Sequence, residues 1–305
     1  MNKKNWIQII VGVIILAVFL KLINLADSLH IVSQAIWPIF VIAMLTSVVT
    51  QVLRGLRFYH ISRSINVDTG IKKSILVQFM TSLAGIATPA KIGEGGKILF
   101  FKNKNKLTFS FILEKIADFS LQFLIGFLAI FTFQIYVDLF YFVLVLFIIG
   151  IIALFKIDKI LNFVLRKNEF EKGWFFNILK GINKKSFLIF SVLTFLLWFN
   201  INLSVWVYAL SLGLVLDMFL LFQIFTVSNL MGTISGTPGG IGSTQIVFTF
   251  MMVTFMGVSS SLAGAVAIIS VIGIYIIYTI LTLIGFLLYR RFFKKQDSAL
   301  PGNNK

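Results

Sequence analysis

The sequence predicts an all-α polytopic membrane protein with about six full spanning helices and two broken re-entrant hairpins arranged as inverted repeats. Three observations support this fold class. Of the 305 residues, 58% are hydrophobic and only 12% are charged. The Lys and Arg residues are confined to a few segments, and two apolar segments are interrupted by similar motifs that contain Pro and Gly. Such a composition requires the bilayer as solvent and excludes a soluble domain.

The positions of the basic residues predict the topology. Of the 27 Lys and Arg residues, 25 fall into five groups, which are the amino terminus and the segments 54–73, 91–106, 156–185 and 290–305. Because cytoplasmic loops are enriched in Lys and Arg, we expect all five groups on the cytoplasmic side of an inner (cytoplasmic) cell membrane, with both termini cytoplasmic. The formal net charge of +16 follows from this topology and does not indicate nucleic-acid binding.

The apolar segments give the order of the elements. Full spans are expected over residues 6–26, 35–54, 107–133, 137–155, 186–210 and 261–289. The first span lacks a small-residue cleavage site, so we expect it to be retained rather than removed as a signal peptide. Residues 1–290 should form a single transmembrane domain. Its parts are half one (1–155), a cytoplasmic amphipathic linker (156–185) and half two (186–290), and a basic cytoplasmic tail (291–305) follows.

Two further apolar segments are broken and are expected to form hairpins. Residues 74–101 are interrupted at 88–97 and have basic flanks, so this segment should enter and leave from the cytoplasm. Residues 218–256 are interrupted at 235–245 and have acidic or neutral flanks, so this segment should enter and leave from the outside.

Both interruptions contain the motif T-P-x-x-I-G, at residues 88–93 and 237–242, and each follows a glycine, Gly85 or Gly232. Matching broken segments that enter from opposite faces are typical of inverted-topology repeats, which bind substrate where the broken helices meet. Non-helical backbone at this depth must be buried in protein or line a wet cavity. The alternative, two full spans kinked at Pro, remains open at this point.

Charged residues occur inside the apolar segments. An isolated charge at the bilayer centre costs about 2.5–3.5 kcal/mol, so each needs a partner. Glu114, Asp118 and Gln122 are spaced to share one helix face that looks into the bundle, and Lys115 is close enough to neutralise one of the acids. One interpretation is an internal ion-pair network that fixes helix packing. For Glu94, in a glycine-flanked break, binding of a polar ligand is favoured.

The second broken segment is nearly neutral and offers hydrogen-bonding groups among glycines. Gly232, Gly236 and Gly240 also form small-xxx-small steps, which favour close helix contact. The sequence contains no cysteine, and His30 and His60 have no partner at ligand spacing, so neither a disulfide nor a metal site is expected.

Four motifs occur in a fixed order: R-x-x-R-F at 54–58, P-A-K-I-G-E-x-x-K at 89–97, E-K-x-x-D at 114–118 and P-G-G-I-G at 238–242. In this set the chain resembles the flippase-like family built on the transmembrane region of lysylphosphatidylglycerol synthetases, over nearly its whole length. The resemblance implies movement of polar-headed lipids between leaflets. The candidate substrate-binding and transport residues, taken from these motifs and the polar groups beside them, are Pro89, Lys91, Gly93, Glu94, Lys97, Glu114, Asp118, Pro238, Gly239, Gly240, Gly242 and Gln245, with Arg54, Arg57 and Lys115 as supporting charge.

Three departures from the family pattern bear on the substrate. Lys97 stands where Arg is common, Gln245 stands where Glu is common, and the last helix lacks an Arg that is often present. Loss of the Glu and the Arg together resembles removal of a matched pair, so half two is expected to bind a different headgroup or none. A soluble aminoacyl-transferase domain is absent from the sequence, so lysine transfer by this chain alone is not expected.

The leading functional hypothesis is therefore a lipid flippase for an aminoacylated phospholipid or a polyprenyl-linked substrate. We expect no cofactor, no metal and no catalytic residue, and we expect membrane lipids, anionic or lipid-linked, as partners. No nucleotide-binding motif is present, so movement would be passive or ion-coupled. Two alternatives stay open: a non-transporting partner of a lipid-modifying enzyme, and an intramembrane lipid transferase using Glu114 and Asp118 as acid and base. The oligomeric state, including a homodimer, is also open.

Overall fold

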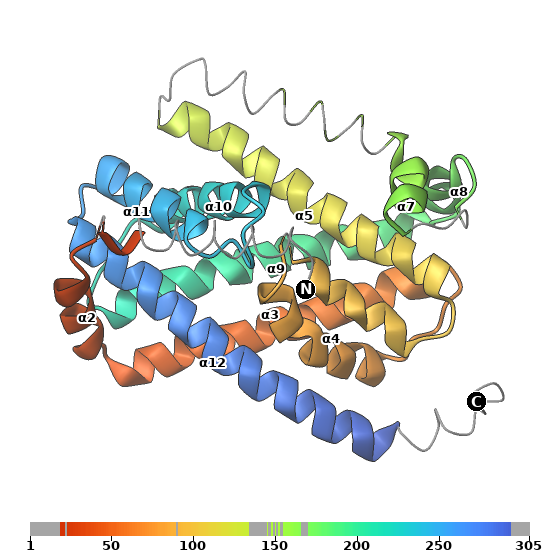
Figure 1. Ribbon diagram of the computed structural model, residues 1–305, viewed down its shortest axis with the longest axis horizontal. Coiled ribbons are helices and arrows are strands. Elements are labelled where there is room, and N and C mark those ends of the chain that lie inside the picture. Colours follow the sequence, from red (N-terminus) through yellow and green to blue (C-terminus); the bar gives the residue numbers. More distant parts are fainter. Residues whose placement is uncertain are drawn as a thin grey trace.

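The computed structural model describes residues 19–21, 23–89, 91–133, 145, 148, 150, 152, 155–165 and 170–293. These residues are helical apart from turns, connecting loops and one isolated β-bridge (Figure 1). The named helices are α2 (Leu25–Ser33), α3 (Trp37–Ser64), α4 (Ile71–Ile86), the 3₁₀ helix η1 (Ile92–Phe100), α5 (Lys104–Thr132), α7 (Ile157–Leu165), α8 (Trp174–Lys180), α9 (Lys184–Ser211), α10 (Met218–Ile234), α11 (Ser243–Met256) and α12 (Ser260–Phe292).

Within the described residues, four helices are long and apolar enough to cross a membrane: α3, α5, α9 and α12. They correspond to four of the expected full spans, and the prediction of an all-α polytopic membrane protein is confirmed. Large apolar side chains such as Leu45, Phe195 and Leu287 are exposed on these helices, as lipid-facing residues are. The expected spans 6–26 and 137–155 lie largely outside the described residues.

One expected boundary is wrong. The span predicted to end at Arg54 continues as α3 to Ser64, ten residues further. Arg54, Arg57 and Lys97 were assigned to cytoplasmic groups, but all three are buried inside the bundle. At about 1.5 Å of rise per residue, Arg54 lies about 15 Å from the end of α3. An Arg can lie within a span when an acidic residue in the interior pairs with it. Here Arg54 pairs with Glu94, and Arg57 pairs with Asp118.

Local sequence explains where several helices begin and end. The side chain of Asn183 accepts the backbone N–H of Ser186 at the start of α9, and Asp217 accepts that of Leu220 at the start of α10. Ser259 caps α12 in the same way. At the end of α11, Gly257 adopts a left-handed conformation with φ of 66°, which stops the helix.

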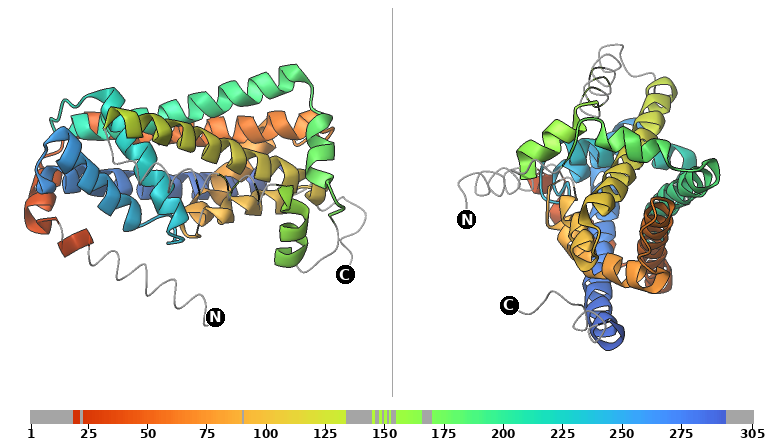
Figure 2. Two further views of the ribbon diagram at one scale, coloured as in Figure 1. Left: turned by 90° about the horizontal axis from the view of Figure 1, so that it is seen from above. Right: turned by 90° about the vertical axis from the view of Figure 1, so that its right-hand side faces the viewer.

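The two broken segments form the predicted hairpins. In the first, α4 packs against η1, and in the second, α10 packs against α11. The two hairpins approach from opposite ends of the bundle, and their tips meet near its middle (Figures 1 and 2). Because neither half of a hairpin continues through the bundle, the alternative of two kinked full spans is wrong.

The helix packing has internal symmetry. α3 packs against α9. α4 packs against α12, just as α10 packs against α5. η1 packs against α5, just as α11 packs against α12. A single operation that exchanges α3 with α9, one hairpin with the other, and α5 with α12 reproduces each of these contacts. The exchanged helices run in opposite directions along the bundle (Figure 2). This is the arrangement of inverted repeats.

Basic residues gather at one end of the bundle, which we call the basic end. Here α3 and α12 finish, and α4, α5 and α9 begin (Figure 2). The described Lys and Arg residues there are Arg63, Lys72, Lys73, Lys102, Lys104, Lys106, Lys156, Lys159, Lys172, Lys180, Lys184, Lys185, Arg290 and Arg291. The loops at the opposite end, residues 34–36, 212–217 and 257–259, contain one acid and no basic residue. Apart from the basic residues inside the bundle, the described Lys and Arg residues of the predicted groups thus lie at one end of the structure.

The linker folds back onto the basic end. Phe175 of α8 is buried against Phe109 of α5, with ring centroids 4.9 Å apart, and Trp174 packs edge-on to the same ring. Phe163 of α7 is in contrast strongly exposed. A short amphipathic helix with an apolar residue facing outward at the end of a membrane bundle suits the interface of the bilayer.

Candidate functional site

The tips of the two hairpins touch through their repeated motifs. Pro89 and Pro238 form an isolated antiparallel β-bridge, and the backbone N–H of Gly239 donates to the carbonyl oxygen of Thr88 at 3.1 Å. Gly239 has a φ of 60°, and a Cβ there would collide with the carbonyl oxygen of Ile86. A glycine at this position therefore permits the close approach of the two backbones.

Glycines also allow η1 to fold back onto α4. A Cβ on Gly85 would lie 2.6 Å from Cγ of Glu94, and a Cβ on Gly93 would collide with the carbonyl of Ala84. The hydroxyl of Thr88 accepts the backbone N–H of Gly93 at 2.7 Å and closes the turn. In a 3₁₀ helix, residues three apart share a face, so η1 presents Glu94 and Lys97 together to the interior, where both are buried.

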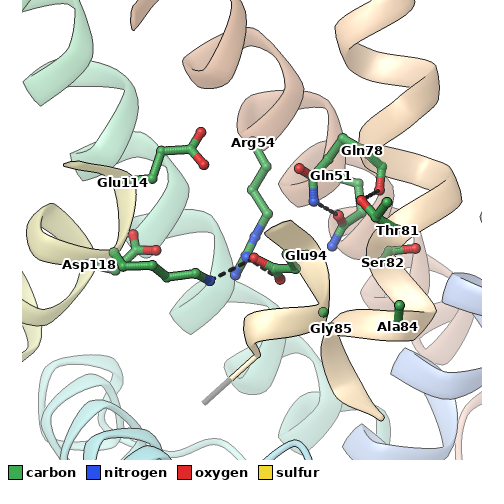
Figure 3. A network of polar contacts seen from close by, with 12 residues as sticks. Gln51, Arg54, Gln78, Thr81, Ser82, Ala84, Gly85, Glu94, Glu114 and Asp118 are labelled. Carbon is green, nitrogen blue, oxygen red and sulfur yellow. Dashed lines mark hydrogen bonds and ion pairs between the residues drawn. The ribbon is translucent and has the colours of Figure 1, made fainter. Parts of the chain in front are cut away.

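Glu94 lies at the centre of an ion-pair network (Figure 3). One carboxylate oxygen accepts a hydrogen bond from Nη1 of Arg54 at 2.5 Å, and the other accepts one from Nζ of Lys115 at 2.8 Å. We expected Lys115 to neutralise an acid on its own helix, and this is wrong. Lys115 reaches across from α5 to η1 instead.

The two acids of α5 pair with other cations. Glu114 accepts from Nζ of Lys97 at 2.6 Å, and Nε of Arg57 lies 3.7 Å from its other oxygen. Asp118 forms a two-pronged pair with Arg57, at 2.7 and 3.1 Å. The indole N–H of Trp198 on α9 also donates to Asp118 at 3.0 Å. Bidentate pairing of this kind fixes both distance and orientation between helices.

A pair of amides extends the network on the side away from α5 (Figure 3). The amide nitrogen of Gln78 on α4 donates to Gln51 on α3 at 3.0 Å, and the oxygen of Gln78 accepts from Lys97 at 3.2 Å. Both glutamines are completely buried. Glu114, Asp118 and Gln122 share one buried face of α5, as the sequence spacing predicts.

A cavity of about 120 Å³ lies between the hairpins and beside this network. A volume of this size holds several waters or a phosphate-sized group. Its polar lining comes from both halves: Ser47, Thr50, Arg54, Lys91, Glu94, Ser204, Asn229, Thr244, Gln245, Ser270, Tyr275 and Tyr278. Lys91, directly after the break, has a left-handed backbone with φ of 56°, and among the described residues no carboxylate lies within ion-pair distance of it.

The second hairpin contributes neutral groups to the cavity. The side-chain oxygen of Gln245 accepts the backbone N–H of Gly242 at 2.6 Å, which fixes its position at the start of α11. A Cβ on Gly232 would collide with the hydroxyl of Thr244, so this glycine lets the two arms of the hairpin close. Gly85 has the same effect in the first hairpin, where it lets η1 pack against α4.

The predicted site residues fall into three groups. Those that line the cavity are Arg54, Lys91, Glu94, Gly239 and Gln245. Those held in the ion-pair network behind it are Arg57, Lys97, Glu114, Lys115 and Asp118. Those that shape the hairpin tips are Pro89, Gly93, Pro238, Gly240 and Gly242.

Sequence reasoning missed other residues of the site, among them Gln51, Gln78, Trp198, Tyr275 and Tyr278. A glutamine within an apolar span is a polar group that needs a partner, so Gln51 and Gln78 could have been recognised from the sequence as buried polar residues. The aromatic residues carried none, because Trp and Tyr are ordinary in membrane helices. Within the described residues, no group of His, Cys, Asp and Glu side chains is arranged to hold a metal ion.

Comparison with known proteins identifies the family. The sequence model described as the lysylphosphatidylglycerol synthase TM region matches residues 5–282. No curated protein matches the chain. The match covers most of the chain, including both hairpins and the whole ion-pair network. The chain therefore belongs to the family of the lysylphosphatidylglycerol synthase transmembrane region, as its motifs indicate.

Proposed function

We propose that this protein moves a polar-headed lipid, such as an aminoacylated phospholipid or a polyprenyl-linked substrate, between the leaflets of the cytoplasmic membrane. The observation that carries the proposal is the polar cavity between two hairpins that approach from opposite ends of the bundle. Inverted-repeat transporters bind substrate at such a meeting point. The headgroup would pass through the cavity while the acyl chains remain in lipid.

Family membership supports a function connected with membrane lipids. The alternative of an intramembrane transferase finds less support, because its proposed acid and base, Glu114 and Asp118, are absent from the cavity lining. Both are held in ion pairs with Lys97 and Arg57. They serve to position helices around the cavity, whereas an acid–base pair must reach the reacting atoms.

A groove at the basic end supports a route for the headgroup. It has a volume of about 750 Å³ and is lined by Gly95, Ile98, Lys102, Lys104 and Lys106 together with neighbouring residues. Glu94, the residue before Gly95, lines the inner cavity. The helix η1 thus separates groove from cavity, and its movement away from α5 would join the two.

The basic end is proposed to face the cytoplasm. The gathering of basic residues there supports this orientation through the positive-inside rule. The groove would then collect headgroups from the inner leaflet, to which basic residues contribute about 1 kcal/mol each for anionic lipids near the surface.

The proposal is tested with purified protein in liposomes that contain a trace of acyl-labelled fluorescent lipid. Phosphatidylglycerol, lysylated phosphatidylglycerol and polyprenyl phosphate are compared by quenching the outer leaflet over time. We expect at least one to cross faster than in protein-free liposomes, and we expect Glu94→Gln to slow that lipid at least tenfold. If none crosses faster than in protein-free liposomes, the proposed function is wrong.

The matched control is Glu171→Gln, the same change at an exposed site in the linker. It should transport as the wild type does. Because Glu94 also holds Arg54 and Lys115, thermal unfolding of each variant is measured beside transport. A folded Glu94→Gln variant with wild-type transport would exclude the cavity as the route.

A further inference from the structure

The charges around η1 do not balance. Five cations, Arg54, Arg57, Lys91, Lys97 and Lys115, surround three carboxylates, Glu94, Glu114 and Asp118, which leaves an excess of two positive charges. The other described acids are Asp27, Asp68, Asp158, Glu171 and Asp217, which lie in end loops, at helix ends or in the linker. Uncompensated charge inside a membrane bundle is costly, so the site is incomplete without an anion.

Of these five cations, Lys91 alone has no ion pair with a described residue. It lines the cavity, is half-buried, and has no ion pair within the described part of the chain, whereas Lys97 and Lys115 each hold a carboxylate. Arg54 adds a second cation, and its guanidinium carries donors beyond the one bound to Glu94. Both residues line the same cavity.

The remaining lining suits an anion as well. Asn229, Thr244, Gln245, Tyr275 and Tyr278 offer neutral hydrogen-bond donors. The one carboxylate in the lining, Glu94, already accepts from Arg54 and Lys115. An ammonium group would therefore find no free counter-charge and would add to the positive excess.

We infer that the cavity binds a lipid through a negatively charged phosphate, with Lys91 and Arg54 as the phosphate-binding residues, and that it discriminates against cationic aminoacylated headgroups. This deepens the proposed function and rests on it for the transport step only. The phosphate neutralises the excess charge, and its oxygens accept hydrogen bonds from Nζ of Lys91 and from the guanidinium of Arg54. Of the substrates considered above, phosphatidylglycerol and polyprenyl phosphate fit, and lysylated phosphatidylglycerol does not.

The test measures binding to the full chain in detergent, independently of transport, from the shift in thermal unfolding with ligand concentration. The probes are short-chain phosphatidylglycerol, short-chain lysylated phosphatidylglycerol, a short-chain polyprenyl phosphate and inorganic phosphate. We expect at least one of the two anionic lipids to bind, and lysylated phosphatidylglycerol to bind at least tenfold more weakly. Comparable binding of the lysylated lipid would overturn the inference, and binding of inorganic phosphate without either anionic lipid would overturn the assignment to a lipid.

Lys91→Asn is the informative variant, because Asn tolerates the left-handed backbone and removes the ammonium group from the cavity. Loss of a charge-assisted hydrogen bond should weaken the bound anionic lipid roughly tenfold or more. Lys91→Arg should restore binding, and Lys72→Asn, at an exposed site on α4, should leave it unchanged. Wild-type affinity in folded Lys91→Asn would refute the role of Lys91.

The two proposals fail separately. Selective binding of an anionic lipid without faster crossing in liposomes would refute transport and leave the phosphate site intact. Faster crossing of the lysylated lipid alone, with no binding of an anionic lipid, would refute the phosphate site and leave transport intact.

Discussion

Pro89 and Pro238, which occupy the same place in the two T-P-x-x-I-G motifs, pair with each other across the centre of the molecule. When a residue pairs antiparallel with its own equivalent, a local two-fold axis passes between the two. The bridge therefore joins equivalent positions of the two sequence repeats, and it lies at the centre of the symmetry that exchanges the helices. Since proline has no N–H to donate, neither proline is the donor here, and the backbone hydrogen bond beside the bridge runs from Gly239 to Thr88.

The contact between the tips depends on Gly239. Gly239→Ala would place a Cβ against the carbonyl oxygen of Ile86 and should force the hairpins apart. Gly236→Ala is a close control, because Gly236 also has a positive φ, 69°, but nothing lies within 4 Å of its Cβ position. Both variants pay about 1–2 kcal/mol for the left-handed backbone.

We expect Gly239→Ala to be the less stable of the two by a further ~1–3 kcal/mol, the usual cost of overpacking. Thermal unfolding in detergent measures the difference. Equal stability of the two variants would mean that the close approach of the tips contributes nothing to the fold.

Lys97 and Glu114 form a buried ion pair between η1 and α5. Removing one partner of a buried pair costs about 3–5 kcal/mol, because the other charge is left unpaired. We therefore expect both Lys97→Met and Glu114→Gln to be strongly destabilised, and the double variant to lose much less than the sum. The exposed change Lys180→Met should have little effect. Additive losses in unfolding experiments would contradict direct pairing of the two residues.

The broken segments were predictable because Pro and Gly stand out within apolar sequence. Residues 88–97 and 235–245 contain the breaks, and the repeated motif indicated that they meet. The flanking charge gave the direction of each hairpin. These features are local, so one sequence suffices to recognise them.

The pairing of the charges was not predictable in the same way. Lys115 follows Glu114 in the chain, but neighbouring residues on a helix point about 100° apart and do not pair with each other. Lys115 pairs with Glu94 instead, and Glu114 pairs with Lys97. Trp198 donates to Asp118 from a helix 80 residues away. Such partners depend on the rotation and register of packed helices, which no local pattern in the sequence determines. The burial of Arg54 and Arg57 was missed for the same reason.

The orientation of the bundle can be tested with single cysteines, because the chain has none of its own. Lys102 lies in the groove at the basic end, and Val215 is 84% exposed in the opposite loop. We expect Val215→Cys to react with a membrane-impermeant thiol reagent from outside the cell. Lys102→Cys should react only in inverted vesicles. The reverse pattern would place the basic end outside.

Gln245 should control which headgroup charge the cavity accepts. Its side-chain oxygen holds the backbone N–H of Gly242, and a carboxylate in its place would keep this hydrogen bond. Gln245→Glu therefore adds one negative charge to the lining with little change of shape and reduces the positive excess from two to one. Affinity for whichever anionic lipid binds should fall, and affinity for lysylated phosphatidylglycerol should rise.

The expected result is a roughly tenfold change in the ratio of the two affinities, since an added charge in a low-dielectric site contributes on the order of 1–2 kcal/mol. Gln34→Glu makes the same substitution in the loop between α2 and α3 and should leave the ratio unchanged. Binding is measured by thermal unfolding with each lipid. If Gln245→Glu lowers both affinities equally, the residue acts by shape alone, and charge in the cavity does not select the lipid.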